Sequence, residues 1–270
     1  MNDVLDIRIK KGVDSVLDLI GTQADTIENG NDTLMGRTNE IGENVQTIYA
    51  KTAKEETLTE IKGMISELQE SSSSGSTVEL TDAEKVLIAG NGYNTYSVGN
   101  VLSLHWGGTL VNFVVAHKGY KTSGKIVLVS QEVMNTEPIV WAAGYNNYSS
   151  SYLRGFLNTT ILNGFLPEVQ AAIVNTPVAC HNNTTAVTCT DKIWALSYAE
   201  AGLGTQTYAP AEGSALSYFN SAARRSKGQY YWLRTPGTGS TGNAWRVYTG
   251  GTAGNDGVTS TSGVVPAFEI

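Results

Sequence analysis

Apolar residues recur at every seventh position over the first fifty residues of the chain. Val13 opens this series, which continues at Ile20, Ile27, Leu34, Ile41 and Ile48. A weaker series follows four residues behind it, at Leu17, Ala24, Asn31, Thr38 and Val45. Two such series predict the seam of a coiled coil, with the first at heptad position d and the second at position a.

Five glycines make this helix weak on its own, because each lowers helix stability by up to about 1 kcal/mol relative to Ala. They stand at positions 12, 21, 30, 36 and 42. We therefore expect an oligomeric coiled-coil stalk over residues 1–70, with a break near 50–57 where the repeat loses phase. A helical hairpin folding back on its own chain is the alternative. The heptads leave dimer and trimer open.

A Ser/Gly-rich linker over 71–80 leads to a head expected over 81–270. Thr81 and Glu84 have the spacing of a capping box, which predicts a helix over 82–89. The period of apolar residues then becomes two, and predicts three strands over 98–104, 110–117 and 125–130 that form a meander. His117, inside the second strand, is expected at an edge or in a hydrogen bond.

The rest of the head alternates short helices and strands. A serine within 149–151 should cap one helix, and Pro167 should begin another. Arg154 is expected in an internal salt bridge or as a clamp on backbone carbonyls, and not as a ligand contact. A further capping box at Ser197 and Glu200 follows a strand over 193–196. The whole pattern predicts an α+β head behind an α-helical stalk.

Two apolar segments, 230–233 and 264–270, resemble buried strands and bracket a run of mostly Gly, Thr, Ser and Asn. Such residues favour turns, and a few aromatic side chains on an adaptable loop surface are typical of recognition sites. The candidate ligand contacts are Asn243, Trp245, Arg246, Tyr248, Asn255 and Asp256. A second candidate patch holds Tyr145, Asn147 and Tyr148. For Trp245, packing in the core beneath the loops is the alternative.

The charge distribution separates the two parts of the chain and narrows the choice of partners. Residues 1–80 hold 7 Lys or Arg and 15 Asp or Glu, whereas residues 81–270 hold 11 and 10. A nearly neutral head does not attract phosphates, so no nucleic-acid partner is expected. We also expect no membrane anchor and no signal peptide, because no apolar run approaches the required length.

The head shows no convergent set of titratable residues, so no catalytic residue, cofactor or metal site is predicted. Its three His are scattered, and Asn255, Asp256 and Gly257 make up only part of a calcium loop. Cys180 and Cys189 could close a hairpin-like loop as a disulfide worth about 2 kcal/mol. Two unpaired, partly buried thiols are the alternative.

Five segments in order resemble the bacterial and phage family catalogued as domain of unknown function 6273, over about residues 95–270. They are WGGTLVNFVVAHKGY with GKIVLVSQEVM, SSSYLRGFLN, TDKIWALSYAEA, YYWLRTPG and GVVPAFEI. The resemblance implies a C-type-lectin-like or formylglycine-generating-enzyme-like fold, in which the terminal strands meet and a loop-rich face binds the target. In that family's recurring motif, Trp232 and Arg234 are expected to be structural, with Arg234 tying loops together.

The resemblance also implies a setting, because the family occurs in phage tail and bacterial surface proteins. Related lectin-like domains are variable binders in diversity-generating retroelement systems, and the composition of 238–262 resembles such diversified regions. Two departures argue against sugar-binding lectin and oxidase chemistry: the Trp-Asn-Asp calcium pattern and the cysteine pair of the formylglycine-generating enzymes are both missing.

We therefore expect a receptor-binding protein at the tip of a phage tail fibre, and not an enzyme. It would be a homo-oligomer, with a trimer favoured, joined to other tail proteins through its N-terminus. Its head would bind a bacterial surface glycan or protein. The expected location is the virion tail, or an extracellular injection particle, after assembly in the host cytoplasm. The alternative is a structural tail or baseplate-associated protein whose head binds other particle subunits.

Overall fold

The computed structural model describes residues 78–134 and 137–270, which belong to the second of two units that divide at Thr77 and Val78. The expected stalk over 1–70 and the linker up to residue 77 lie outside these residues, and both stay predictions. Within the described part, no helix has the length and apolar character needed to cross a membrane.

The described chain begins with a helix that closes one edge of the main sheet. In α4 (Asp82–Ile88), Thr81 and Glu84 make both hydrogen bonds of the predicted capping box. The Glu84 carboxylate also accepts from the backbone N–H of His105, at 2.7 Å, in the neighbouring strand. The short helix α5 (Gly92–Thr95) follows. The capping prediction is therefore confirmed, and the same glutamate ties the helix to the sheet.

The main sheet has five antiparallel strands in the order β1-β2-β3-β12-β7. The predicted meander is confirmed, with boundaries shifted by a few residues. The chain's last strand pairs with β3 on one side and β7 on the other, so the C-terminal segment lies inside the sheet. The strands are β1 (Val101–Trp106), β2 (Thr109–Lys118), β3 (Ile126–Ser130), β7 (Trp194–Ala195) and β12 (Pro266–Glu269).

A short helical region packs beside this sheet. The Ser151 side chain caps α6 as predicted, and Pro167 occupies the first turn of α7. The predicted internal salt bridge of Arg154 is confirmed, because its guanidinium lies 2.8 Å from the buried Asp191 carboxylate. The elements are η1 (Tyr148–Ser150), α6 (Tyr152–Phe156), the π-helical η2 (Leu157–Ile161) and α7 (Pro167–Ala172).

Three smaller sheets complete the unit, and one of them corrects the sequence-based picture. We expected 238–262 to form loops, but β9 and β10 within it pair with each other and with β8. The strands are β8 (Tyr231–Pro236), β9 (Asn243–Val247) and β10 (Ala253–Gly257), then β5 (Thr176–Asn182) with β6 (Thr185–Asp191), and β4 (Ile139–Val140) with β11 (Thr261–Ser262). One short helix, α8 (Ala222–Arg225), precedes β8.

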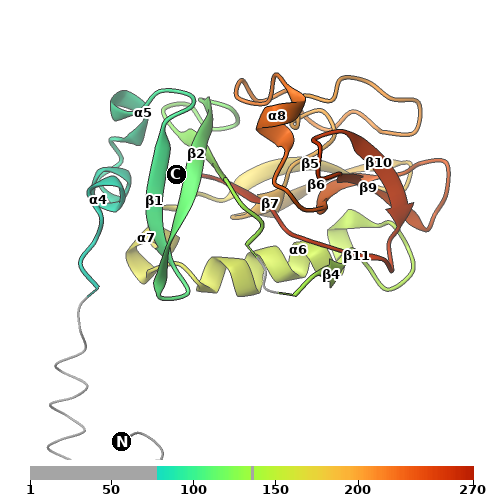
Figure 1. Ribbon diagram of the computed structural model, residues 1–270, viewed down its shortest axis with the longest axis horizontal. Helices are drawn as coiled ribbons and strands as arrows, with labels where there is room; N and C mark the ends of the chain where they lie inside the picture. The colour runs from blue at the N-terminus through green and yellow to red at the C-terminus, as the bar shows by residue number, and fades with distance from the viewer. Residues whose placement is uncertain (1–77, 135–136) are drawn as a thin grey trace, which may run out of the picture. The chain divides into compact units, whose positions relative to one another are not determined.

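The described unit is therefore mostly β-sheet with few helices, around a single apolar core. The rings of Phe113, Phe165 and Phe268 contact one another there, with centroids 5.3–5.6 Å apart. In Figure 1, the β1–β2 hairpin (green) and the β9–β10 hairpin (dark red) lie at opposite ends of this unit.

Candidate functional site

The sheet formed by β8, β9 and β10 divides the six C-terminal candidate residues between its two faces. Side chains alternate along a strand, and the register sets Asn255 opposite Trp245 and Asp256 opposite Ala244. One face therefore carries Arg246, Tyr248 and Asp256. The other carries Asn243, Trp245 and Asn255. The prediction grouped these six by sequence alone, and they cannot all contact one ligand from one side.

The first face holds a guanidinium between aromatic rings. Arg246 forms an ion pair with Asp256, and its guanidinium carbon lies 4.7 Å from the Tyr230 ring centroid and 5.6 Å from that of Tyr248. The phenol of Tyr248 lies over Gly254, where a Cβ atom would come within 2.0 Å of its oxygen. Arg246 and Asp256 thus neutralise each other and orient the two tyrosines.

On the second face, Trp245 belongs to the core. Its side chain is only 6% exposed, and its indole N–H donates to the backbone carbonyl of Tyr208 at 3.1 Å. The ring meets that of Tyr198 edge to face, with 4.7 Å between centroids. Its role as a ligand contact stays a prediction. In this structure it supports the loops above it.

Asn146 joins the two candidate patches, although it lies between predicted residues and was not itself predicted. It is fully buried, and its side-chain amide donates to the carbonyls of Gly237, Ser240 and Asn243 at 2.7–3.2 Å. Its backbone N–H donates to the Thr241 carbonyl at 2.8 Å. Residues about ninety positions apart in the chain therefore form one surface.

Tyr208 adds a third segment to this surface. The Tyr208 carbonyl accepts from the backbone N–H of Thr238 at 3.0 Å, and its ring packs against Gly239. Tyr145 and Tyr208 are 71% and 52% exposed, so both rings are available to a ligand. We call this surface the loop face. Its residues belong to the segment 237–243 or to the segments beside it, and they are Tyr145, Asn147, Tyr208, Ser240, Asn243 and Asn255.

The turn between β5 and β6 supports the loop face from the side. Asn182 accepts from the backbone N–H of Ser149 and donates to its hydroxyl, at 3.1 and 2.8 Å. The backbone N–H of Asn183, whose φ of 52° is left-handed, donates to the Asn146 carbonyl at 3.1 Å. Asn147 forms an isolated bridge with Asn182. The loop that carries Tyr145 is therefore hydrogen-bonded both to the β5–β6 turn and to the segment 237–243.

Tyr148, the remaining candidate, lies beneath this surface. Its side chain is fully buried and packs on Trp141, with 6.0 Å between ring centroids. Burial raises the pKa of the Tyr148 hydroxyl well above its usual value. As with Trp245, the predicted contact stays untested, and the observed position is one of support.

Beneath the loop face lies a buried charged network centred on Arg234. Its guanidinium pairs with Glu200, and also donates to the carbonyls of Ala179 and Ala195, each at 2.9 Å. Burial disfavours its charge, but the carboxylates of Glu200 and Glu212 outweigh burial and raise the pKa of Arg234. The predicted role of Arg234 in tying loops together is confirmed, whereas its two acidic partners were missed.

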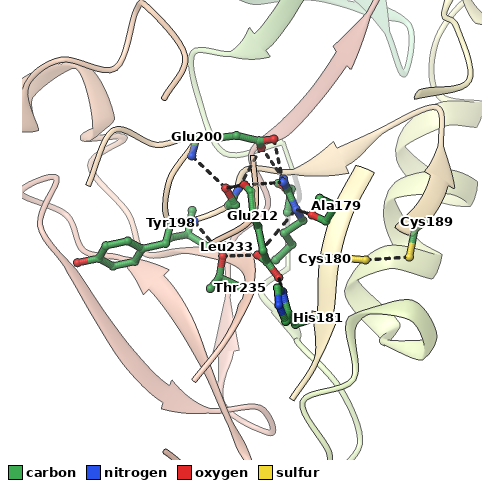
Figure 2. Close-up of polar contacts among 12 residues, drawn as sticks. Ala179, Cys180, His181, Cys189, Tyr198, Glu200, Glu212, Leu233 and Thr235 are labelled. Carbon is green, nitrogen blue, oxygen red and sulfur yellow. Dashed lines mark hydrogen bonds and ion pairs between the residues drawn. The ribbon is translucent and has the colours of Figure 1, made fainter. Parts of the chain in front are cut away.

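The network extends from Glu212 to further elements. The Thr235 hydroxyl donates to the Glu212 carboxylate at 2.6 Å, and His181 on β5 lies 3.1 Å from the other oxygen of that carboxylate. Figure 2 shows Glu212 between Thr235 and His181, with Glu200 nearby. Both glutamates are almost completely buried. Both carboxylates are therefore closed to solvent, and each is paired with Arg234.

The partial calcium motif is already used internally. One carboxylate oxygen of Asp256 accepts from the backbone N–H of Gly257 at 2.7 Å, and the other pairs with Arg246. Across residues 78–134 and 137–270, no group of three or more His, Cys, Asp or Glu side chains is placed to hold a metal ion.

Comparison with known proteins gives one match. No curated protein and no solved structure matches this chain. The family described as Domain of unknown function (DUF6273) matches residues 123–270, which is more than half of the 270 residues, and starts after β2. The resemblance expected over about 95–270 is therefore confirmed for its larger, C-terminal part. The chain belongs to the DUF6273 family.

Proposed function

We propose that this protein is the receptor-binding tip of a phage tail fibre, or of a similar injection particle, and that its loop face binds a bacterial surface glycan or protein. The observation that carries the proposal is the tether made by Asn146. It holds two distant loops together, and exposed rings stand on one of these loops, at Tyr145, and on the neighbouring third segment, at Tyr208. Rigid, exposed tyrosines among small polar residues supply contact area at low entropic cost.

The proposal includes a C-type-lectin-like fold for the head. Two features support it: the C-terminal strand β12 lies inside the main sheet, and a small second sheet projects the loop-rich region. Its ligand would be a neutral or weakly charged surface, because the loop face is built from Tyr, Asn and Ser. Catalysis is not part of this function.

We further propose a homotrimer held by the heptads of residues 1–70, with its N-terminus joined to the tail. Several heads on one stalk raise apparent affinity by roughly 10²–10⁴ through effective concentration. Sedimentation of the full chain gives the copy number, and a monomer would contradict the stalk.

Adsorption to a panel of bacterial strains tests the loop face. We expect Tyr145→Ala, combined with Tyr208→Ala, to lower adsorption of the full chain at least tenfold, because both exposed rings are lost. The thermal midpoint should stay unchanged, since exposed side chains contribute little to stability. Tyr152→Ala is the matched control, because Tyr152 is also exposed but lies on α6 against Phe156. Equal adsorption by the wild type, the double variant and Tyr152→Ala would show that the loop face is not the binding surface.

A structural tail protein is the second candidate, favoured by one observation. Val101 and Leu110 are both exposed on the outer face of the β1–β2 hairpin, where Leu110 pairs opposite His105. This hairpin lies at the end of the unit opposite β9 and β10 (Figure 1). If Leu110→Ser removed the protein from assembled particles while adsorption of the free protein persisted, contact with other subunits would also be part of its function.

A further inference from the structure

Cys180 and Cys189 face each other across the β5–β6 hairpin. Their sulfur atoms lie 3.0 Å apart, and the residues stand at diagonal positions, since Cys180 pairs with Val187 and Cys189 with Val178. Figure 2 shows both sulfurs turned toward one another. A disulfide requires about 2.05 Å between sulfurs. The two sulfurs would therefore have to approach by roughly a further 1 Å for the bond to form.

The surroundings hold this pair in position. Ala179, on one side of Cys180, accepts from the Arg234 guanidinium, and His181, on the other side, contacts Glu212. The β5 backbone is therefore fixed at both neighbours of Cys180. The whole chain holds only these two cysteines, so no other thiol of the same chain competes.

We propose that Cys180 and Cys189 are a disulfide-forming site, which closes when the protein meets a small-molecule disulfide outside the reducing cytoplasm. A thiolate of the pair attacks the small disulfide, forms a mixed disulfide and expels one thiolate. The second cysteine then attacks the cysteine sulfur of the mixed disulfide and expels the other thiolate. The pair loses two protons and two electrons, and the small disulfide is reduced to two thiols.

Cys189 is the attacking residue. It is 6% exposed, whereas Cys180 is 1% exposed. Burial raises the pKa of the Cys180 thiol, which keeps it protonated and slow to react in the folded protein. The first attack in the folded protein therefore comes from Cys189, and Cys180 completes the exchange.

Closure would stiffen the loop face, because the turn that follows β5 supports it. Asn182 and Asn183 lie two and three residues beyond Cys180 in the hairpin and hold Ser149 and Asn146. Amide hydrogen exchange over 144–149 should therefore slow after oxidation, whether or not that surface binds a receptor.

The test refolds the full chain in buffers of oxidised glutathione, with and without a phosphine reductant. We expect a product without intermolecular disulfides, lighter by two hydrogen atoms per chain, resistant to iodoacetamide, with a thermal midpoint raised by roughly 5 °C. Added reductant should reverse all three changes in the wild-type protein, so the result does not depend on a variant that fails to fold. Thiols that remain alkylatable after refolding, or only intermolecular bonds, would overturn the proposal.

Single variants test the order of attack. In Cys180→Ser only Cys189 remains, and in Cys189→Ser only Cys180 remains. The mixed disulfide with glutathione should form several-fold faster in Cys180→Ser than in Cys189→Ser. Equal rates would refute the assignment of Cys189 as the attacking thiol. The Cys180→Ser, Cys189→Ser double variant should show no midpoint shift between the two buffers.

Discussion

Replacing Arg234 by Met will destabilise the described unit by about 3–5 kcal/mol, because it leaves the Glu200 and Glu212 carboxylates buried without their cation. The loss goes beyond one ion pair, since the same guanidinium also satisfies the carbonyls of Ala179 and Ala195. Domains of this size have a total stability of about 5–15 kcal/mol. Urea unfolding, followed by tryptophan fluorescence, measures the change in midpoint and slope.

Two variants make this measurement specific. Arg224 is exposed on α8, so Arg224→Met should change stability by no more than about 0.5 kcal/mol. Adding Glu200→Gln to Arg234→Met should cost less than the sum of the single changes, because one of the stranded charges disappears. An Arg234→Met protein within about 1 kcal/mol of the wild type would show that the network contributes little.

Trp245→Ala will cost about 3–5 kcal/mol, the range for removing a buried aromatic side chain. The indole fills the space beside Tyr198, and its N–H binds the Tyr208 carbonyl. The matched change Tyr145→Ala, on a side chain that is 71% exposed, should be nearly neutral. The same urea titration compares both variants with the wild type.

The measured stability of Trp245→Ala determines how adsorption data on Trp245 are interpreted. If Trp245→Ala is destabilised and Trp245→Phe restores both stability and adsorption, Trp245 acts by holding the loops in place. A Trp245→Ala protein of wild-type stability that no longer adsorbs would instead make the indole a direct contact.

Local signals carried the successful fold predictions. The capping boxes at Thr81 and Ser197 and the proline at position 167 each act within four residues, and the structure contains all three. The period of two located β1, β2 and β3 for the same reason, since alternation is a property of a single strand. Their boundaries moved because cross-strand pairing, and not composition, ends a strand.

Non-local contacts account for what the sequence did not reveal. The strand β10 is rich in Gly and Asn and contains no β-branched residue, so its pairing with β9 follows from neighbours and not from propensity. Glu212 lies 22 residues from Arg234 in the chain, and no short motif links them. Arg225 likewise donates to the carbonyls of Gly251 and Gly202, which lie 26 and 23 residues away in the chain.

The candidate site also combines local signals, which the sequence carries, with non-local contacts, which it does not reveal. Composition singled out two segments, 145–148 and 243–256, which Asn146 links at Asn243, but it could not assign residues to the faces of a sheet that it did not predict. Asn146 was overlooked because a buried asparagine looks no different in sequence from its exposed neighbours. The structure buries Asn146 and Tyr148 and exposes Tyr145, a difference that the sequence Tyr-Asn-Asn-Tyr does not reveal.

Hydrogen exchange of the full chain, free and bound to the envelope fraction of an adsorbing strain, tests the central claim most directly. We expect binding to protect 142–149 and 237–243 together, because Asn146 makes them one surface, and to leave 101–118 unchanged. Protection confined to 101–118, with exchange at both loops unaltered, would contradict recognition through the loop face.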